Sequence, residues 1–131
     1  MRTLTSHLVN PANDKLAITV EDEPGQGGAC HRYVARGFSL AGNPSSREED
    51  DFTGTLPIIF QNGPIAEVGV NGLTHEALLA ILEDRLEHFQ KGPYACRENA
   101  LALTNIQQAQ MWLQKRTRDR MARNVEGTHV I

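Results

Sequence analysis

The stretch that decides the fold runs from residue 74 to residue 120 and reads THEALLAILEDRLEHFQKGPYACRENALALTNIQQAQMWLQKRTRDR. Thr74 is a favourable helix N-cap, and Glu76 places a negative charge in the first turn, where the helix dipole favours it. Apolar side chains then recur on one helical face, namely Leu78, Leu82, Leu86 and Phe89. Gly92 and Pro93 end the pattern, which predicts a first helix of about 17 residues, or roughly 25 Å.

A second and longer helix is predicted to begin near Pro93, because proline is tolerated in the first turn of a helix. No helix breaker follows before Gly127, which gives about 30 residues, or roughly 45 Å. The shorter helix can therefore cover only about half of the longer one. Met111, Trp112 and Leu113 lie on the uncovered half, where an apolar patch is unfavourable in water. We expect a second copy of the chain to cover this patch in a homo-oligomer.

The long helix carries a seam whose positions alternate in steps of four and three residues, as in a helix that packs against another helix. The residues of this seam are Ala95, Asn99, Ala102, Ile106, Ala109, Leu113, Arg116 and Arg120. The centre of the seam is apolar and small, so two helices can approach closely there. Its two ends are polar, with an asparagine at one end and two arginines at the other.

Five cations gather within nine residues near the C-terminal end of the long helix, and only Asp119 opposes them. They are Lys115, Arg116, Arg118, Arg120 and Arg123. One interpretation is that the seam frays into solvent here and that the arginines merely extend into water. The other interpretation is a binding site, because guanidinium groups match the oxygens of phosphate groups. The pattern favours neither interpretation over the other.

Distance along the helix limits how a binding site can be built. Asn99 and Arg116 are 17 residues apart on one helix, and hence about 25 Å apart, which no small nucleotide spans. If two long helices cross antiparallel about a two-fold axis, Asn99 of one chain meets Arg116 and Arg120 of the partner subunit. Phe89 would lie near Asn99. Each dimer then has two identical pockets, each with an aromatic ring, an amide and two guanidinium groups, which suits a nucleotide pyrophosphate.

Residues 1–70 have the pattern of β-strands. Apolar and polar residues alternate over residues 16–20, as a half-buried strand requires, and residues 32–38 are a second candidate strand. The polar and acidic stretch at residues 41–51 contains a proline, and we expect a mobile loop there.

Two apolar runs, residues 56–60 and 65–70, are separated by a turn at residues 61–64 that contains Asn-Gly. Asn-Gly tolerates the positive φ angles of a tight turn, so we predict a β-hairpin. The sequence therefore predicts an α+β fold, with a small N-terminal antiparallel β-sheet over residues 1–70. A C-terminal antiparallel helical hairpin with a long second helix follows over residues 71–131. We expect one domain of 131 residues.

The composition excludes some functions. The net charge of −3 argues against the electrostatic footprint of a protein that binds duplex nucleic acid. No apolar stretch approaches the length that crosses a bilayer, so we expect no membrane association. Cys30 and Cys96 lie in different halves and have no CxxC spacing, which predicts free thiols in a reducing cytoplasm.

An enzyme is one alternative. The five histidines are scattered and form no metal-binding motif, and no glycine-rich loop stands between a strand and a helix. Cys96 lies beside Arg97 but has no evident base partner, so we expect a plain buried thiol. The sequence thus predicts no catalytic residue, no metal site and no cofactor.

A small helical scaffold or a nucleic-acid-binding protein is the other alternative. The basic stretch at residues 115–123 favours it, whereas the acidic remainder and the 5% aromatic content oppose it. Binding of nucleic acid through five cations weakens steeply with salt, and an enclosed pocket responds much less.

Several short motifs recur in an order that resembles the bacteriophage anti-Thoeris sponge family, which shares a helical-hairpin domain with the anti-CBASS sponge. The motifs are FQNGPI at residues 60–65, GVNG at 69–72, EALL at 76–79, FQ at 89–90, ACRENALAL at 95–103, RTRDR at 116–120 and VEGT at 125–128. The similarity covers residues 60–128, and the β-rich N-terminal part fits the anti-Thoeris branch.

This resemblance implies a function. The family sequesters glycocyclic ADP-ribose, the cyclic nucleotide signal of Thoeris defence, without degrading it, and so acts in the cytoplasm of the infected bacterial host. Members are built from dimers, some form hexamers as trimers of dimers, and some also bind the cyclic di- and trinucleotides of CBASS at separate pockets. The ligand-binding residues of the family correspond here to Phe89, Asn99, Arg116 and Arg120.

Overall fold

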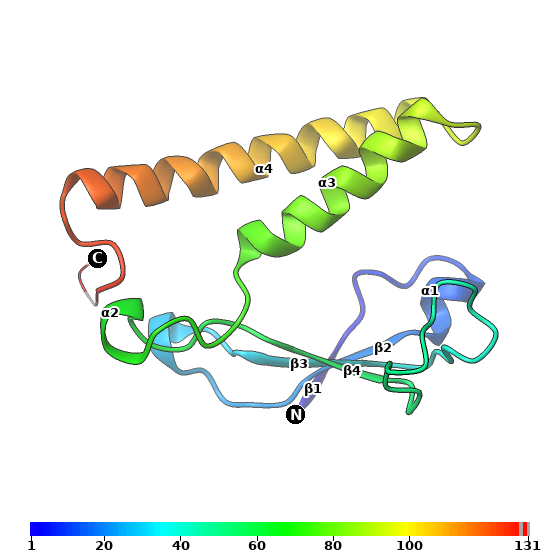
Figure 1. Cartoon of the computed structure of the whole chain (residues 1–131), viewed down its shortest axis with the longest axis horizontal. Coiled ribbons are helices and arrows are strands. Elements are labelled where there is room, and N and C mark those ends of the chain that lie inside the picture. Colours follow the sequence, from blue (N-terminus) through cyan, green and yellow to red (C-terminus); the bar gives the residue numbers. More distant parts are fainter. Residues whose placement is uncertain (129, 131) are drawn as a thin grey trace. The chain divides into compact units, whose positions relative to one another are not determined.

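A computed structural model describes residues 1–128 and 130 of the chain. The chain divides into two compact units, Met1–Asn62 and Gly63–Ile131 (Figure 1). The first unit contains a β-sheet and the second contains the long helices. This confirms the predicted α+β fold, with an N-terminal antiparallel sheet followed by helices of which the last is long.

The first unit is built on a four-stranded antiparallel sheet in the order β1-β2-β3-β4. The strands are β1 (Arg2–Leu4), β2 (Ala17–Val20), β3 (Arg32–Arg36) and β4 (Thr55–Ile59). Each strand pairs with the next along the chain, so the sheet is a meander. The strands predicted near residues 16–20, 32–38 and 56–60 are thus confirmed, with small differences at their ends.

Two short elements near the N-terminus were not predicted. Strand β1 has three residues and helix α1 (Pro11–Lys15) has five, both too short for a periodic pattern to appear. The signal for α1 lies in its cap. The Asn10 side chain accepts a hydrogen bond from the Asn13 amide at 2.9 Å, and Pro11 occupies the first turn.

The β-hairpin predicted across residues 56–70 is wrong. Residues Ile65–Val68 form a short helix, α2, which begins directly after Pro64. The amides of Val68 and Gly69 donate to the carbonyls of Pro64 and Ile65, both at 2.9 Å. A proline that starts a helical turn outweighs the β-preference of Ile65 and Val68, and β4 pairs with β3 instead.

The core of the first unit is small and lies between β2 and β3. Within the described residues, Val20 and Val34 are the largest fully buried side chains, and Cys30 is also buried. Gly37 ends β3 with a φ of +92°, and a Cβ atom there would lie 1.8 Å from the Lys15 carbonyl oxygen. Only glycine therefore permits the close approach of this turn to the end of α1.

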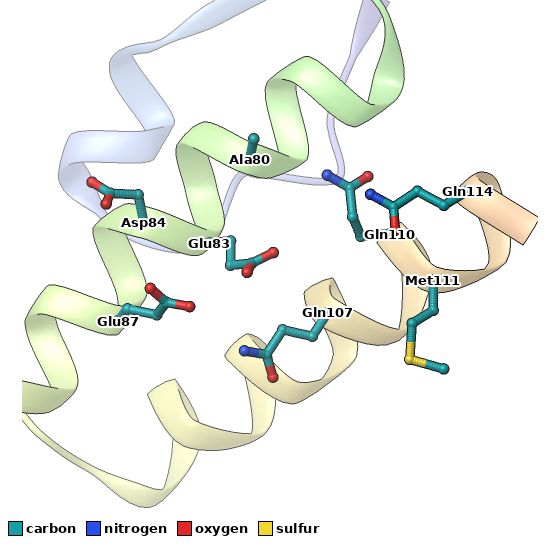
Figure 2. A pocket seen from close by; sticks show the side chains of 8 residues that line it. All are labelled: Ala80, Glu83, Asp84, Glu87, Gln107, Gln110, Met111 and Gln114. Atoms are coloured by element: carbon teal, nitrogen blue, oxygen red, sulfur yellow. The ribbon is translucent and has the colours of Figure 1, made fainter. Parts of the chain in front are cut away.

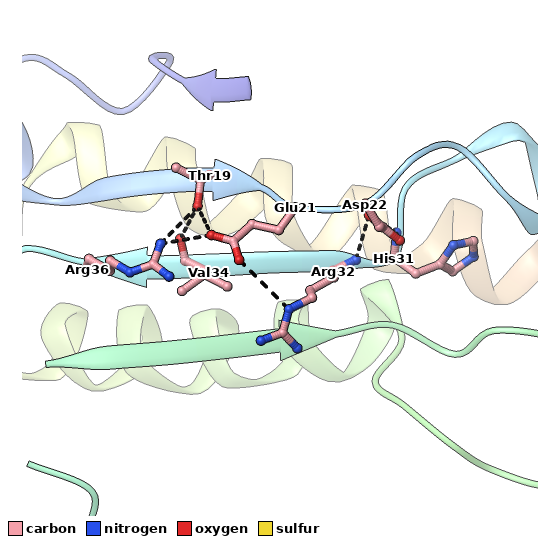
Figure 3. Close-up of polar contacts among 7 residues, drawn as sticks. All are labelled: Thr19, Glu21, Asp22, His31, Arg32, Val34 and Arg36. Carbon is pink, nitrogen blue, oxygen red and sulfur yellow. Dashed lines mark hydrogen bonds and ion pairs between the residues drawn. The ribbon is translucent and has the colours of Figure 1, made fainter. Parts of the chain in front are cut away.

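Polar contacts tie β2 to β3 beside this core (Figure 3). The Glu21 carboxylate accepts hydrogen bonds from the Arg36 guanidinium at 2.9 Å and from the Thr19 hydroxyl at 2.7 Å. These two bonds lower the pKa of Glu21. The pKa of Asp22 is lowered because its carboxylate accepts hydrogen bonds from the backbone amides of His31 and Arg32.

We predict that acid destabilises the sheet through these two carboxylates. Their ordinary pKa values are 4.5 and 3.8, and folding lowers both. The stabilising contribution is therefore complete above those values and is lost as the pH falls through the lower folded values. Thermal unfolding from about pH 6 to about pH 3 should show a falling Tm, and Glu21→Gln should flatten part of that fall.

Glu48→Gln is the matched control, because Glu48 lies in the loop between β3 and β4, away from this network. It should leave the slope of Tm against pH unchanged. An equal slope in the wild type and Glu21→Gln would contradict the role assigned to Glu21.

The second unit is dominated by two helices, α3 (His75–Lys91) and α4 (Arg97–Ala122), which lie side by side near their connecting turn (Figure 1). The predicted cap is confirmed, since the Thr74 hydroxyl accepts a hydrogen bond from the Ala77 amide at 3.1 Å. Helix α3 has 17 residues and ends at Gly92, as predicted. The helical hairpin with a long second helix is therefore confirmed.

The predicted start of the long helix at Pro93 is wrong, because α4 begins at Arg97 with Cys96 as its N-cap. The Cys96 sulfur accepts a hydrogen bond from the Asn99 amide at 3.4 Å. The residues after Gly92 are needed to reverse the chain direction. Helix α4 has 26 residues and is about 39 Å long. None of the described helices combines the length and apolar character that crossing a membrane requires.

Candidate functional site

The hairpin turn brings together aromatic and polar groups. The Phe89 ring lies edge-on to the Tyr94 ring, with their centroids 6.1 Å apart. The Arg85 guanidinium lies 5.0 Å from the centroid of the Phe89 ring, within reach of a cation–π interaction. Phe89 is partly buried in this cluster and Tyr94 is 72% exposed, so the turn presents an aromatic surface.

Asn99 belongs to the same cluster, because its side-chain amide donates a hydrogen bond to the Tyr94 carbonyl at 3.3 Å. The structure thus brings two of the predicted binding residues, Phe89 and Asn99, to one end of the hairpin through Tyr94. Tyr94 was not among the predicted binding residues. Its signal was an aromatic residue directly after the Gly92–Pro93 helix stop.

Gln90 fixes the shape of the turn. Its side-chain amide nitrogen donates to the Cys96 carbonyl, and its side-chain oxygen accepts from the Cys96 amide, both at 3.2 Å. The last turn of α3 is thereby bonded to the N-cap of α4. Cys96 is exposed, so the prediction of a buried thiol at this position is wrong. The exposed sulfur instead caps the N-terminus of α4.

A basic hollow of about 390 Å³ lies near the other end of α4. The side chains that line it are Trp112, Lys115, Arg116, Asp119, Arg120 and Arg123. Lys115 pairs with Asp119 at 2.7 Å, whereas Arg116 is exposed and has no hydrogen bond or ion pair among the described residues. Trp112 is 68% exposed. Arg116 is therefore available to a phosphate group, next to an aromatic ring.

Arg120 is held differently. It is 7% exposed, and its Nε donates to the Glu126 carboxylate at 2.9 Å. Its terminal nitrogens donate to the carbonyls of Val125 at 2.9 Å, Thr128 at 3.4 Å and Val130. The arginine that the pattern placed beside Arg116 is thus bonded to the C-terminal residues of its own chain.

The four predicted binding residues fall into two groups within one chain. Phe89 and Asn99 lie at the hairpin turn, and Arg116 and Arg120 lie near the opposite end of α4. The 17 residues of helix between Asn99 and Arg116 correspond to about 25 Å. A single chain therefore does not join the two groups into one pocket.

A second groove, of about 690 Å³, lies between α3 and α4 (Figure 2). Its polar lining consists of Glu83, Asp84, Glu87, Gln107, Gln110 and Gln114. Figure 2 shows the carboxylates of Glu83 and Glu87 on α3 directed toward α4. Three carboxylates without a lining cation repel phosphate groups. Among the described residues, no group of three or more histidines, cysteines or acidic residues could hold a metal ion.

A family model and a phage protein each match a large part of this chain. Residues 55–118 match the model of the Acb2/Tad1 hairpin domain. A protein from Bacillus phage SBSphiJ7, named Thoeris anti-defense 1, is 45% identical over 93 residues. These residues are 70% of this chain and 66% of the relative. The chain therefore contains an Acb2/Tad1 hairpin domain over residues 55–118.

This assignment confirms the resemblance to the anti-Thoeris sponge family. The matched hairpin domain contains Phe89, Asn99 and Arg116, whereas Arg120 follows its last matched residue. The chain spans just under two thirds, 66%, of the length of the phage relative.

We predict that Gln90→Ala loosens the Acb2/Tad1 hairpin. The substitution removes both side-chain bonds to the backbone of Cys96 and should lower the free energy of unfolding by about 1–3 kcal/mol. Chemical denaturation followed by circular dichroism measures this loss. Gln108→Ala is the control, because Gln108 is exposed on α4 and bonds to no other described side chain. Equal stability of the two variants would show that the two hydrogen bonds between Gln90 and Cys96 do not stabilise the hairpin.

Proposed function

We propose that this protein is a phage anti-defence sponge that binds glycocyclic ADP-ribose and withholds it from its effector without degrading it. The observation that carries the proposal is the 45% identity, over 93 residues, to a phage protein named Thoeris anti-defense 1. The chain acts as a binding protein rather than an enzyme, in the cytoplasm of the infected bacterium. Cyclic di- and trinucleotides of CBASS are a second set of ligands to test.

The chemistry at the two ends of the hairpin supports this ligand. An exposed aromatic cluster around Phe89 offers a surface for a nucleobase, and the amide of Asn99 adds a hydrogen-bonding group beside it. The guanidinium of Arg116 is exposed and suits the oxygens of a pyrophosphate. A dinucleotide-like ligand needs both kinds of group in one pocket.

A symmetric dimer brings the two ends together. In an antiparallel arrangement of two α4 helices, Phe89 and Asn99 of one chain face Arg116 and Arg120 of the partner subunit. The exposed apolar side chains of α4 support such a contact, since Met111 is 60% and Trp112 is 68% exposed in the single chain. Dimers then carry two identical pockets, and three dimers form the hexamer that some family members adopt.

We predict that the protein binds glycocyclic ADP-ribose and returns it unchanged. Incubation with the ligand, followed by heat denaturation and mass spectrometry of the supernatant, should recover the intact molecule. Arg116→Ala should weaken binding at least tenfold, because a charge-assisted hydrogen bond contributes about 1.5–3 kcal/mol.

Two outcomes would contradict this proposal. Recovery of a cleaved product would identify an enzyme. Failure to bind any cyclic nucleotide, combined with binding of nucleic acid that weakens steeply with salt, would identify a nucleic-acid-binding protein.

We predict that two inactive variants, Asn99→Ala and Arg116→Ala, rescue each other when mixed. In a mixed dimer one pocket contains both intact residues and the other contains both defects. After subunit exchange about half of the dimers are mixed, so about a quarter of all pockets regain native affinity. Isothermal titration calorimetry reports this as a fractional stoichiometry.

Phe89→Ala mixed with Asn99→Ala is the matched control, because both substitutions fall on the same side of the pocket. In that mixed dimer each pocket carries one defect, so no rescue is expected. A stable monomer in light scattering would contradict the pocket shared between two subunits. The absence of rescue despite proven subunit exchange would contradict it as well.

A further inference from the structure

The C-terminal residues after α4 fold back onto the end of that helix. We call residues 123–128 and 130 the tail. The Val125 amide donates to the Arg120 carbonyl at 3.0 Å, and the Ala66 amide donates to the Gly127 carbonyl at 3.2 Å. The tail therefore links the last turn of α4 to helix α2 within the second unit.

The tail surrounds the guanidinium of Arg120. Glu126 pairs with its Nε at 2.9 Å, in an ion pair whose side chains are 8% and 35% exposed. A guanidinium has five N–H groups, and at least four of them here donate to tail oxygens. Arg120 still lines the basic hollow beside Arg116. The hydrogen bonds to the tail therefore fix the orientation of the Arg120 side chain, which would vary if the side chain extended into solvent.

We propose that Glu126 is a positioning residue of the binding site, which holds the Arg120 guanidinium toward the hollow. This inference rests on the proposed function, because it assigns Glu126 a role in the same pocket. An arginine side chain in water samples many rotamers, and fixing one of them on binding costs entropy. The tail fixes the rotamer before the ligand arrives. Arg116 is then free to bind the phosphate group with both terminal nitrogens, while Arg120 contributes its positive charge in a fixed position.

The positioning role and simple electrostatics predict opposite changes in affinity when the Glu126 carboxylate is removed. Glu126 is a negative charge close to a surface that binds an anion. If charge alone mattered, removal of that carboxylate would tighten anion binding. If the carboxylate positions Arg120, its removal weakens binding, because a neutral amide oxygen holds the guanidinium less firmly than the carboxylate of an ion pair does.

The experiment compares two variants by calorimetry with glycocyclic ADP-ribose as the probe. Glu126→Gln should bind about fivefold more weakly than the wild type, since it keeps the shape of the side chain but loses the ion pair with Arg120. Glu48→Gln is the matched control, because it makes the same chemical change in the loop between β3 and β4, in a residue that neither lines the hollow nor belongs to the tail. Glu48→Gln should bind as tightly as the wild type.

A third variant and a second measurement distinguish a positioning role from a general loss of folding. Glu126→Asp keeps the charge but shortens the side chain, so it should also weaken binding, which a purely electrostatic role would not produce. Hydrogen exchange of the Val125 amide, measured without ligand, should be faster in Glu126→Gln, because the tail is less firmly anchored.

The outcomes separate the two proposals. If the wild type does not bind glycocyclic ADP-ribose, the proposed function fails, and the positioning role of Glu126 fails with it. If the wild type binds and Glu126→Gln binds equally or more tightly, only the positioning role is overturned. In the latter case the tail competes with the ligand for Arg120 or acts on stability alone.

Discussion

The second unit depends on the difference in length between its two main helices. Helix α3 ends after 17 residues and α4 continues for 26, so α3 cannot accompany α4 over its full length. A rise of about 1.5 Å per residue then separates the aromatic cluster at the turn from the cations near the far end of α4. The exposure of apolar side chains along α4 follows from this difference, and the division of the binding residues into two groups follows from the length of α4 itself.

Charge divides the same hairpin into two distinct surfaces. The groove between α3 and α4 carries three carboxylates, while the hollow near the end of α4 carries arginines beside an exposed tryptophan. Phosphate groups are repelled by the first and attracted by the second. The net charge of the chain, −3, therefore says little about its ligand, because opposite charges are segregated on the surface rather than mixed.

Local sequence patterns, such as helix caps, helix stops and apolar periodicity, predicted the main helices and strands. Thr74 and Gly92 set the ends of α3 because a cap and a stop act within a few residues. The same patterns failed where competing local preferences were close in energy. Residues 65–68 are apolar enough for a strand, yet Pro64 starts a helical turn there. Proline is compatible with the first turn of a helix, but at Pro93 the chain still has to reverse its direction. Helix α4 therefore begins only after the N-cap Cys96.

The sequence by itself determined which residue types are available for binding and how far apart they lie on α4, because helical spacing follows from residue numbers alone. Only the tertiary structure decided what surrounds them. Arg116 and Arg120 are the same residue type one helical turn apart, and the pattern treats them alike. One is exposed, whereas the other is buried against the tail. The difference arises because the tail folds back on one side of the helix, which depends on Glu126 and on contacts with α2 that no local pattern encodes.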